Sequence, residues 1–326
     1  MPGKHISLKG NIFSASFILL IVLNNNPFLL PGESISQTPP PPPDQFQAEM
    51  PSQSHEILAF HASQSHGISD EAASWISQGA YDEDFCVVDP YPPCTGIIAP
   101  YGFHSWDPDS DGYWKPPLFP SGSGLGHINL LFNNAIQAYE SGQVQTAYLW
   151  LGRAVHIMGD MATPAHVNLD MHPFGEAYED WLEMNGLANT HAWISAHPAG
   201  SAWDKRFTDL PGWAELNADL QSELNNASQV YGGRGSGQEL WNSGPAGRDV
   251  ILFRLMFLMA EEADNWDSND VSGEKYHGDL ASSAYLSQMR DVLFPLLIPY
   301  SAALIDYFEF AAVETEVYLP IIIGSS

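Results

Sequence analysis

The sequence of 326 residues contains only two cysteines, and its 11 lysines and arginines face 39 aspartates and glutamates. Two thiols are too few for the cysteine-rich frameworks of structural zinc sites. The formal net charge of −28 argues against the basic surface that proteins binding long nucleic acids present to the phosphate backbone. A small site can still accept one phosphate group if bound cations supply the positive charge.

An apolar run near the N-terminus is too short to cross a bilayer. Ile12–Leu23 follows Lys4 and Lys9, and this length and these flanking charges are typical of a signal-peptide core. A small-x-small cleavage site is missing, so an uncleaved membrane anchor stays open as the alternative. We expect a signal peptide or N-terminal anchor over 1–36, a proline-rich linker with "TPPPPPD" over 37–49, and a secreted or extracytoplasmic protein.

The two cysteines lie close together in "FCVVDPYPPCTG", as Cys86 and Cys94. A short loop closed by a disulfide fits an exported protein. Two free buried thiols are the alternative, because sequence spacing alone does not show the geometry that a disulfide needs.

Hydrophobic residues recur three and four apart along most of the chain beyond residue 50, which predicts a mainly α-helical domain. We expect a single multi-helix domain over 50–312 and an apolar C-terminal tail over 313–326. The predicted helices are 54–64, 69–84, 126–143, 144–161, 249–266 and 282–310. The third and fourth should form a hairpin around Ser141–Gly142, and Pro295 or Pro299 should bend the last. Dense Gly, Pro and Trp between 198 and 248 predict long loops over the helical core.

The segment "HIMGDMATPAH", residues 156–166, places three polar groups in an otherwise apolar helix. His156 and Asp160 are four residues apart, so they share one face and can bind one ion together. His166 follows Pro164, which ends or kinks the helix and can turn His166 toward a neighbouring ion. Any one of these histidines alone would be expected as an ordinary core residue.

Further histidines and carboxylates surround this segment in the sequence. The candidate metal ligands are His55, Asp84, His104, His156, Asp160, His166, His172, Glu176 and Glu179. Histidine and carboxylate without thiolate form the ligand set of catalytic zinc, which uses about three protein groups per ion and keeps a position for water. A set of this size therefore predicts more than one zinc ion.

One neighbouring segment has a competing interpretation. "DPDSDG", residues 107–112, begins like an EF-hand calcium loop, but its twelfth position is Leu118, where a bidentate glutamate is needed. We therefore expect a turn that is capped by its own aspartate side chains.

These motifs resemble those of the zinc-dependent phospholipases C, the family related to the P1/S1 nucleases. "AYLWLGRAVHIMGDMATPAHV" is similar to that family's H-x3-D-x5-H helix, and "FHSWDPDSDG" to its segment with a ligand histidine before D-P-D. "QGAYDEDF" resembles the segment that carries a metal-bound carboxylate, and "SHEILAF" resembles the start of the family's first helix. The likeness spans roughly residues 50 to 310, and it implies the all-α fold of that family.

The resemblance also implies two zinc ions. The first would be bound by His104, His156, Asp160 and Asp84, and the second by His166, His172 and a glutamate. That glutamate is Glu176 by its spacing from His172, or Glu179 by its pairing with Tyr178. A third zinc and the role of His55 stay open, because the family uses an N-terminal tryptophan there and none precedes Trp75.

The implied activity is that of a zinc-dependent phosphodiesterase, in the first place a phospholipase C that releases diacylglycerol and a phosphorylated head group by zinc-activated water. Asp84 would be a ligand or the general base. Phe85 and Tyr101 resemble aromatic residues that hold a choline head group by cation–π attraction, with simple packing as the alternative. We expect a phospholipid or other phosphodiester as substrate, transient contact with a membrane surface, and no protein partner.

Two other functions stay open. A nuclease of the P1/S1 type would need a base-stacking aromatic residue near the zinc ions, and Ser105 follows His104 instead. A non-catalytic, metal-binding secreted protein is the third interpretation, favoured only by the missing N-terminal tryptophan.

Overall fold

The computed structural model describes residues 54–85, 103–110, 112–113, 122–170, 177–230, 236–242, 248–268, 280 and 282–317. All of them belong to one of the two units into which the chain divides, Pro39–Ser326. Every regular element in these residues is a helix, apart from one isolated bridge between Asp107 and Gly112. The prediction of an all-α fold is therefore confirmed.

Several predictions fall outside the described residues. They are the signal peptide or anchor, the proline-rich linker, the pairing of Cys86 with Cys94, the tail beyond 317, and the residues Tyr101, His172 and Glu176. Asp84 and Phe85 end a described helix, but their side chains lie outside the described set.

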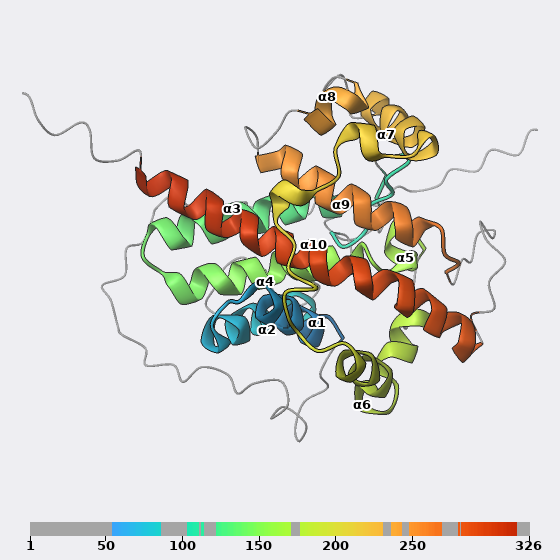
Figure 1. Cartoon of the computed structure of the whole chain (residues 1–326), viewed down its shortest axis with the longest axis horizontal. Helices are drawn as coiled ribbons and strands as arrows, with labels where there is room; N and C mark the ends of the chain where they lie inside the picture. Colours follow the sequence, from blue (N-terminus) through green and yellow to red (C-terminus); the bar gives the residue numbers. More distant parts are fainter. Residues whose placement is uncertain are drawn as a thin grey trace, which may run out of the picture. The chain divides into compact units, whose positions relative to one another are not determined.

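Four helices in the first half of the unit pack together, and two of them carry three of the six predicted ligands that meet: His55 on one helix, and His156 and Asp160 on another. The four helices are α1 (Ser54–His66), α2 (Asp70–Phe85), α3 (Gly124–Glu140) and α4 (Val144–Asp160). The α3–α4 hairpin is confirmed: Gly142 lies between the two helices at φ +76°, a left-handed conformation that glycine adopts without steric cost. Figure 1 shows α1 and α2 beside α4.

α2 and α4 cross at two glycines that leave no room for a side chain. A Cβ atom on Gly79 would lie 2.1 Å from the carbonyl oxygen of Leu149, and one on Gly152 would lie 2.1 Å from that of Ile76. Glu83 lies four residues beyond Gly79, and His156 lies four beyond Gly152. The close crossing therefore brings the turn of α2 that carries Glu83 close to the turn of α4 that carries His156.

The helices that follow α4 complete the unit. α5 (Pro164–Val167) and α6 (Ala177–Ala196) follow α4, and α9 (Arg248–Asp264) and α10 (Ser283–Val317) end the described chain. α10 runs across α3, α4 and α9 (Figure 1) and contacts all three as well as α1. Its apolar residues fill the core; the ring of Tyr307, for example, stacks on Phe132 with centroids 5.2 Å apart.

α10 is longer than predicted. It includes both Pro295 and Pro299, as expected, and it ends at Val317 rather than near 310. Between Ser283 and Ala312 it is long and apolar enough to cross a membrane, but 67% of the most apolar window is buried inside the protein. Core helices of soluble proteins share these properties, so the helix alone is weak evidence for a membrane span.

The segment between 198 and 248 is more regular than predicted. It contains the 3₁₀ turns η2 (Phe207–Asp209) and η3 (Trp213–Glu215), and the helices α7 (Ala218–Val230) and α8 (Gly237–Asn242). α7 starts where the side chain of Asn217 accepts a hydrogen bond from the backbone N–H of Leu220 (2.8 Å), which is a common N-terminal cap. The expectation of long loops was therefore wrong for 218–230.

The turn predicted in place of a calcium loop is confirmed. Asp107 Oδ1 accepts hydrogen bonds from the backbone N–H groups of Asp109 (2.9 Å) and Ser110 (3.3 Å). The aspartate side chain thus closes its own turn, next to His104.

Candidate metal centre

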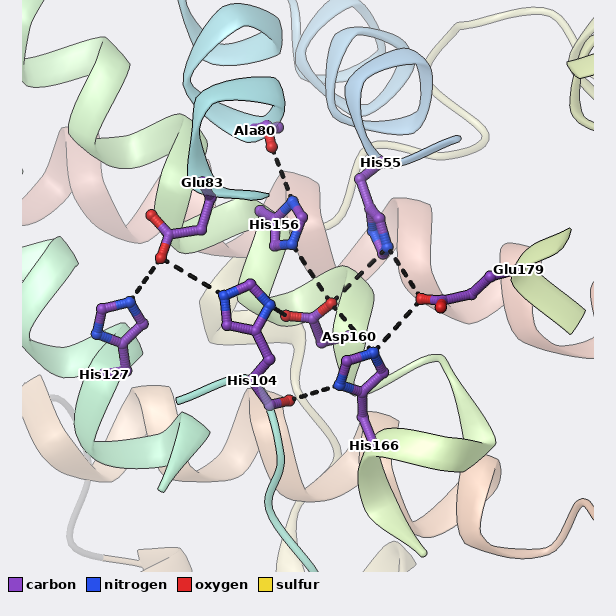
Figure 2. Close-up of polar contacts among 9 residues, drawn as sticks. All are labelled: His55, Ala80, Glu83, His104, His127, His156, Asp160, His166 and Glu179. Atoms are coloured by element: carbon purple, nitrogen blue, oxygen red, sulfur yellow. Dashed lines mark hydrogen bonds and ion pairs between the residues drawn. The ribbon is translucent and has the colours of Figure 1, made fainter. Parts of the chain in front are cut away.

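Six of the predicted ligands meet at the C-terminal end of α4 (Figure 2), from five separate parts of the chain. They are His55 of α1, His104 of the segment before α3, His156 and Asp160 of α4, His166 of α5 and Glu179 of α6. All except His55 and Glu179 are buried. A buried group of this kind requires partners for every charge that it holds.

Asp160 lies at the middle of the group. Its Oδ1 atom is 3.4 Å from Nε2 of His156, and 3.8 Å from Nε2 of both His55 and His166. Its Oδ2 atom is 3.0 Å from Nδ1 of His104. One carboxylate therefore faces four imidazole rings.

Glu179 lies next to two of these imidazole rings, those of His166 and His55. Its Oε1 atom is 3.4 Å from Nε2 of His166 and 3.8 Å from Nε2 of His55. Two sets of three residues place one ligand atom each within 4.8 Å of one another: His55, His156 and Asp160, and Asp160, His166 and Glu179. Because Asp160 belongs to both sets, the arrangement suits two neighbouring ions that share a carboxylate.

The distances fit zinc. Nitrogen and oxygen ligands lie about 2.0–2.2 Å from a tetrahedral zinc ion, which puts neighbouring ligand atoms about 3.4 Å apart. The imidazole–carboxylate separations of 3.4 to 3.8 Å from His55, His156 and His166 match this spacing and exceed ordinary hydrogen-bond lengths. The donor set and its spacing therefore suit the metal that the sequence predicts.

Backbone carbonyl groups fix the orientation of two imidazole rings. His156 Nδ1 is 2.7 Å from the carbonyl oxygen of Ala80, and His166 Nδ1 is 3.1 Å from that of His104. An Nδ1–H that donates to a carbonyl oxygen leaves Nε2 with a lone pair, and this is the usual support for a metal-bound histidine. In both rings Nε2 is the atom that faces Asp160.

The position of the His55 ring depends on Gly159, which has no side chain. A Cβ atom on Gly159 would lie 2.1 Å from His55 Nδ1, so the ring occupies the space that any other residue would fill. The glycine before Asp160 thus allows α1 to bring His55 into the group.

The electrostatics favour positive charge among these residues. Burial opposes ionisation of Asp160, but the imidazoles of His156, His104 and His166 hold its pKa well below its usual value. Burial likewise opposes protonation of His104, but Asp160 and Glu83 raise the pKa of this histidine to about 10. A divalent cation bound to the same carboxylates would replace the protons on these rings.

Sequence reasoning missed a buried carboxylate next to this group. Glu83, one residue before the predicted Asp84, is 3% exposed, and its Oε1 atom lies 3.7 Å from His104 Nε2 and 2.6 Å from His127 Nε2. A signal was present: Ile76, Ala80 and Glu83 follow the spacing of one buried helix face. Burial raises the pKa of Glu83, but the neighbouring imidazoles of His104 and His127 lower it to about 2.

The chain resembles one protein named phospholipase C over part of its length. No family model matches it. A phospholipase C of Listeria monocytogenes serovar 1/2a is 29% identical over 97 residues, which are 28% of this chain and 29% of that protein. The alpha toxin of Clostridium absonum (TM-score 0.48, 12% identity) and the alpha-toxin of Clostridium perfringens strain SWCP (0.49, 14%) each align with 81% of this chain.

These alignments leave much of each relative unmatched. The chain covers 65% of each of the two toxin chains and 29% of the Listeria protein. The chain is therefore similar, over part of its sequence, to a bacterial phospholipase C, and the resemblance predicted from its histidine and aspartate motifs is confirmed.

Proposed function

We propose that this protein is a zinc-dependent phosphoric diester hydrolase that acts as a phospholipase C. The observation that carries the proposal is the pair of ligand sets that share Asp160, built from histidine and carboxylate alone. The partial likeness to a protein named phospholipase C supports the same activity. The apolar run Ile12–Leu23 after Lys4 and Lys9 supports export from the cytoplasm.

In this proposal, His156, Asp160 and either His55 or His104 bind one zinc ion, and His166, Glu179 and Asp160 bind another. The sequence resemblance adds Asp84 as a further candidate for the first ion, and His172 and Glu176 as further candidates for the second. Zinc at these positions supplies a Lewis acid for the phosphate oxygens and lowers the pKa of water toward neutrality.

The protein residues contribute position and charge. The carbonyl oxygens of Ala80 and His104 hold the rings of His156 and His166, so that no reorientation is needed when the centre is loaded. Asp160 and Glu179 balance the charge of the cations within the buried site. Asp84, at the end of α2, is the candidate acceptor for the proton that water loses.

The test is hydrolysis by the purified full chain with its metal content measured alongside. Phosphatidylcholine vesicles, a chromogenic phosphodiester and single-stranded DNA are the three substrates. We expect about two zinc ions per chain, release of phosphocholine, loss of this activity with a chelator and its return with zinc. Nucleotide release without phosphocholine release would favour a nuclease. Full zinc occupancy without turnover of any substrate would favour a non-catalytic metal-binding protein.

A further inference from the structure

A second buried cluster lies behind His104, outside the two ligand sets. Glu83 is at its centre, and its side chain is 4% exposed. Its Oε1 atom is 2.6 Å from Nε2 of His127, on α3, and its Oε2 atom is 3.6 Å from NH1 of Arg153, on α4. Figure 2 shows Glu83 between His127 and His104.

The cluster is built to hold an ionised carboxylate in one orientation. His127 at hydrogen-bond distance and Arg153 at ion-pair distance approach the two oxygens of Glu83 separately from different helices, which restricts the plane of the carboxylate as well as its position. Arg153 is itself 7% exposed and lies over the ring of Trp150, 5.0 Å from its centroid. The ring of His127 contacts Phe103, with centroids 5.2 Å apart. Arg153 and His127 are therefore both held in place by contacts with aromatic rings.

The same carboxylate faces His104. Oε1 of Glu83 lies 3.7 Å from Nε2 of His104, while Nδ1 of that ring lies 3.0 Å from Asp160. His104 is thus oriented by one carboxylate at each ring nitrogen, and a displaced Glu83 would release the ring on one side. The guanidinium of Arg153 next to Glu83 also argues against a further cation bound on the far side of this carboxylate.

We propose that His127 and Arg153 are positioning residues that act on the metal centre through Glu83, with His127 as the main one. His127 holds Glu83 against His104 and so sets where that imidazole stands relative to Asp160. The inference rests on the proposed zinc centre, and it assigns to His127 no contact with zinc or substrate. Supporting groups of this kind change metal affinity about 10- to 100-fold when they are removed.

The experiment measures zinc affinity, by competition with a chromophoric chelator, and the visible spectrum of the cobalt-substituted full chain. We expect His127→Leu to weaken zinc binding about 10- to 100-fold and to change the cobalt spectrum. His127→Gln, whose amide can donate to Glu83, should restore most of the affinity. His191→Leu makes the same substitution at a half-buried histidine of α6 and should leave both readouts unchanged.

A thermodynamic cycle with Glu83→Gln separates the proposed role from general destabilisation. If His127 acts through Glu83, His127→Leu will weaken zinc binding little or not at all in the Glu83→Gln background. Equal effects in both backgrounds overturn the inference, as does unchanged zinc affinity in His127→Leu. Because His127→Leu can fail to fold, Glu83→Gln and His127→Gln provide the same comparison with smaller changes. A wild-type chain that binds no zinc overturns the proposed function itself.

Discussion

Asp160 has a different status from the other residues of the centre, because it is common to both ligand sets. Each imidazole belongs to one set at most, and its removal should weaken one ion more than the other. Removal of the negative charge of Asp160 should affect both ions. It also removes the charge that faces His104 at 3.0 Å.

We therefore expect Asp160→Asn to lose both zinc ions and to reduce turnover by more than about a hundredfold. Elemental analysis of the purified protein and the rate of phosphocholine release are the measurements. Asp291→Asn, at a carboxylate whose side chain is 53% exposed on α10, is the matched control and should change neither. An Asp160→Asn protein with two zinc ions and full activity would contradict the shared-carboxylate arrangement.

His61 provides a pH-dependent property away from the metal centre. It is 4% exposed, on α1, and burial, together with the nearby His197, lowers its pKa to about 4. Because the unfolded value is near 6.5, the unfolded chain binds the proton more readily. The stability that the neutral ring contributes is fully present above pH 6.5 and is lost as the pH falls toward 4.

The expected change is a loss of about 1 to 2 kcal/mol in the free energy of unfolding between pH 7 and pH 4.5, after allowance for solvent screening. Denaturant unfolding of the wild type and of His61→Gln at both pH values measures it. Other groups contribute the same pH slope to both proteins, so the difference between the two slopes reports on His61. Equal slopes would show that the pKa of this histidine is the same in the folded and unfolded states.

Sequence spacing identified the residues of the centre that share one helix, and it did less well with those that fold together from far apart. The four-residue interval of His156 and Asp160 fixes their common face. The choice between Glu176 and Glu179 could not be made in the same way, because it depends on how α6 starts relative to α5. Glu83 was missed because Asp84, its neighbour, matches the pattern of the resemblance, although helix periodicity favours Glu83.

Among the helices, the α2–α4 crossing determines how the centre is assembled. Gly79 and Gly152 let the two backbones approach until a Cβ atom at either position would overlap a carbonyl oxygen of the other helix. One turn further on, His156 donates to the carbonyl oxygen of Ala80. The orientation of a ligand ring is therefore coupled to the distance between two helices.

Gly152→Ala should separate these helices, because the clash is with backbone atoms that cannot rotate away. We expect a loss of about 1 to 3 kcal/mol in stability and, in addition, weaker zinc binding through the displaced ring of His156. Thermal unfolding with and without zinc measures both effects. Gly200→Ala, where no atom lies within 4 Å of the added methyl group, is the control. A Gly152→Ala protein as stable as the wild type would show that the helices separate without cost.

The helices themselves followed from periodicity, and the differences have local causes. Strong apolar repeats predicted α1 to α4 and α9 within a few residues at each end, and the start of α10 but not its extension to Val317. The helix α7 was missed because the glycines and prolines around it suggested loops, whereas Leu224 and Ala227 are buried at helical spacing within it. α10 includes Pro295 and Pro299, as predicted, and its contacts with α1, α3, α4 and α9 support the helix.

At the scale of the whole molecule, the net charge of −28 sets how the protein meets a charged surface. A membrane rich in anionic lipid repels a protein of this charge, and the repulsion extends about 10 Å at 0.1 M salt. Under the proposed function, cations at the centre would act over the short range of the site and would not reverse this field. Under the proposed function, lipid composition should therefore alter the encounter with the vesicle more than the chemical step.

We expect phosphocholine release from phosphatidylcholine vesicles to fall several-fold at low ionic strength when about a third of the lipid is replaced by phosphatidylglycerol. The difference should narrow as added salt shortens the screening length to a few ångströms. A soluble phosphocholine ester that releases a chromophore is the control, because its hydrolysis involves no vesicle and should depend little on salt. If anionic lipid instead accelerates release from vesicles at low salt, a local basic or apolar contact with the membrane outweighs the net charge. That contact would then have to be a small surface whose short-range attraction to the membrane exceeds the repulsion from the acidic residues around it.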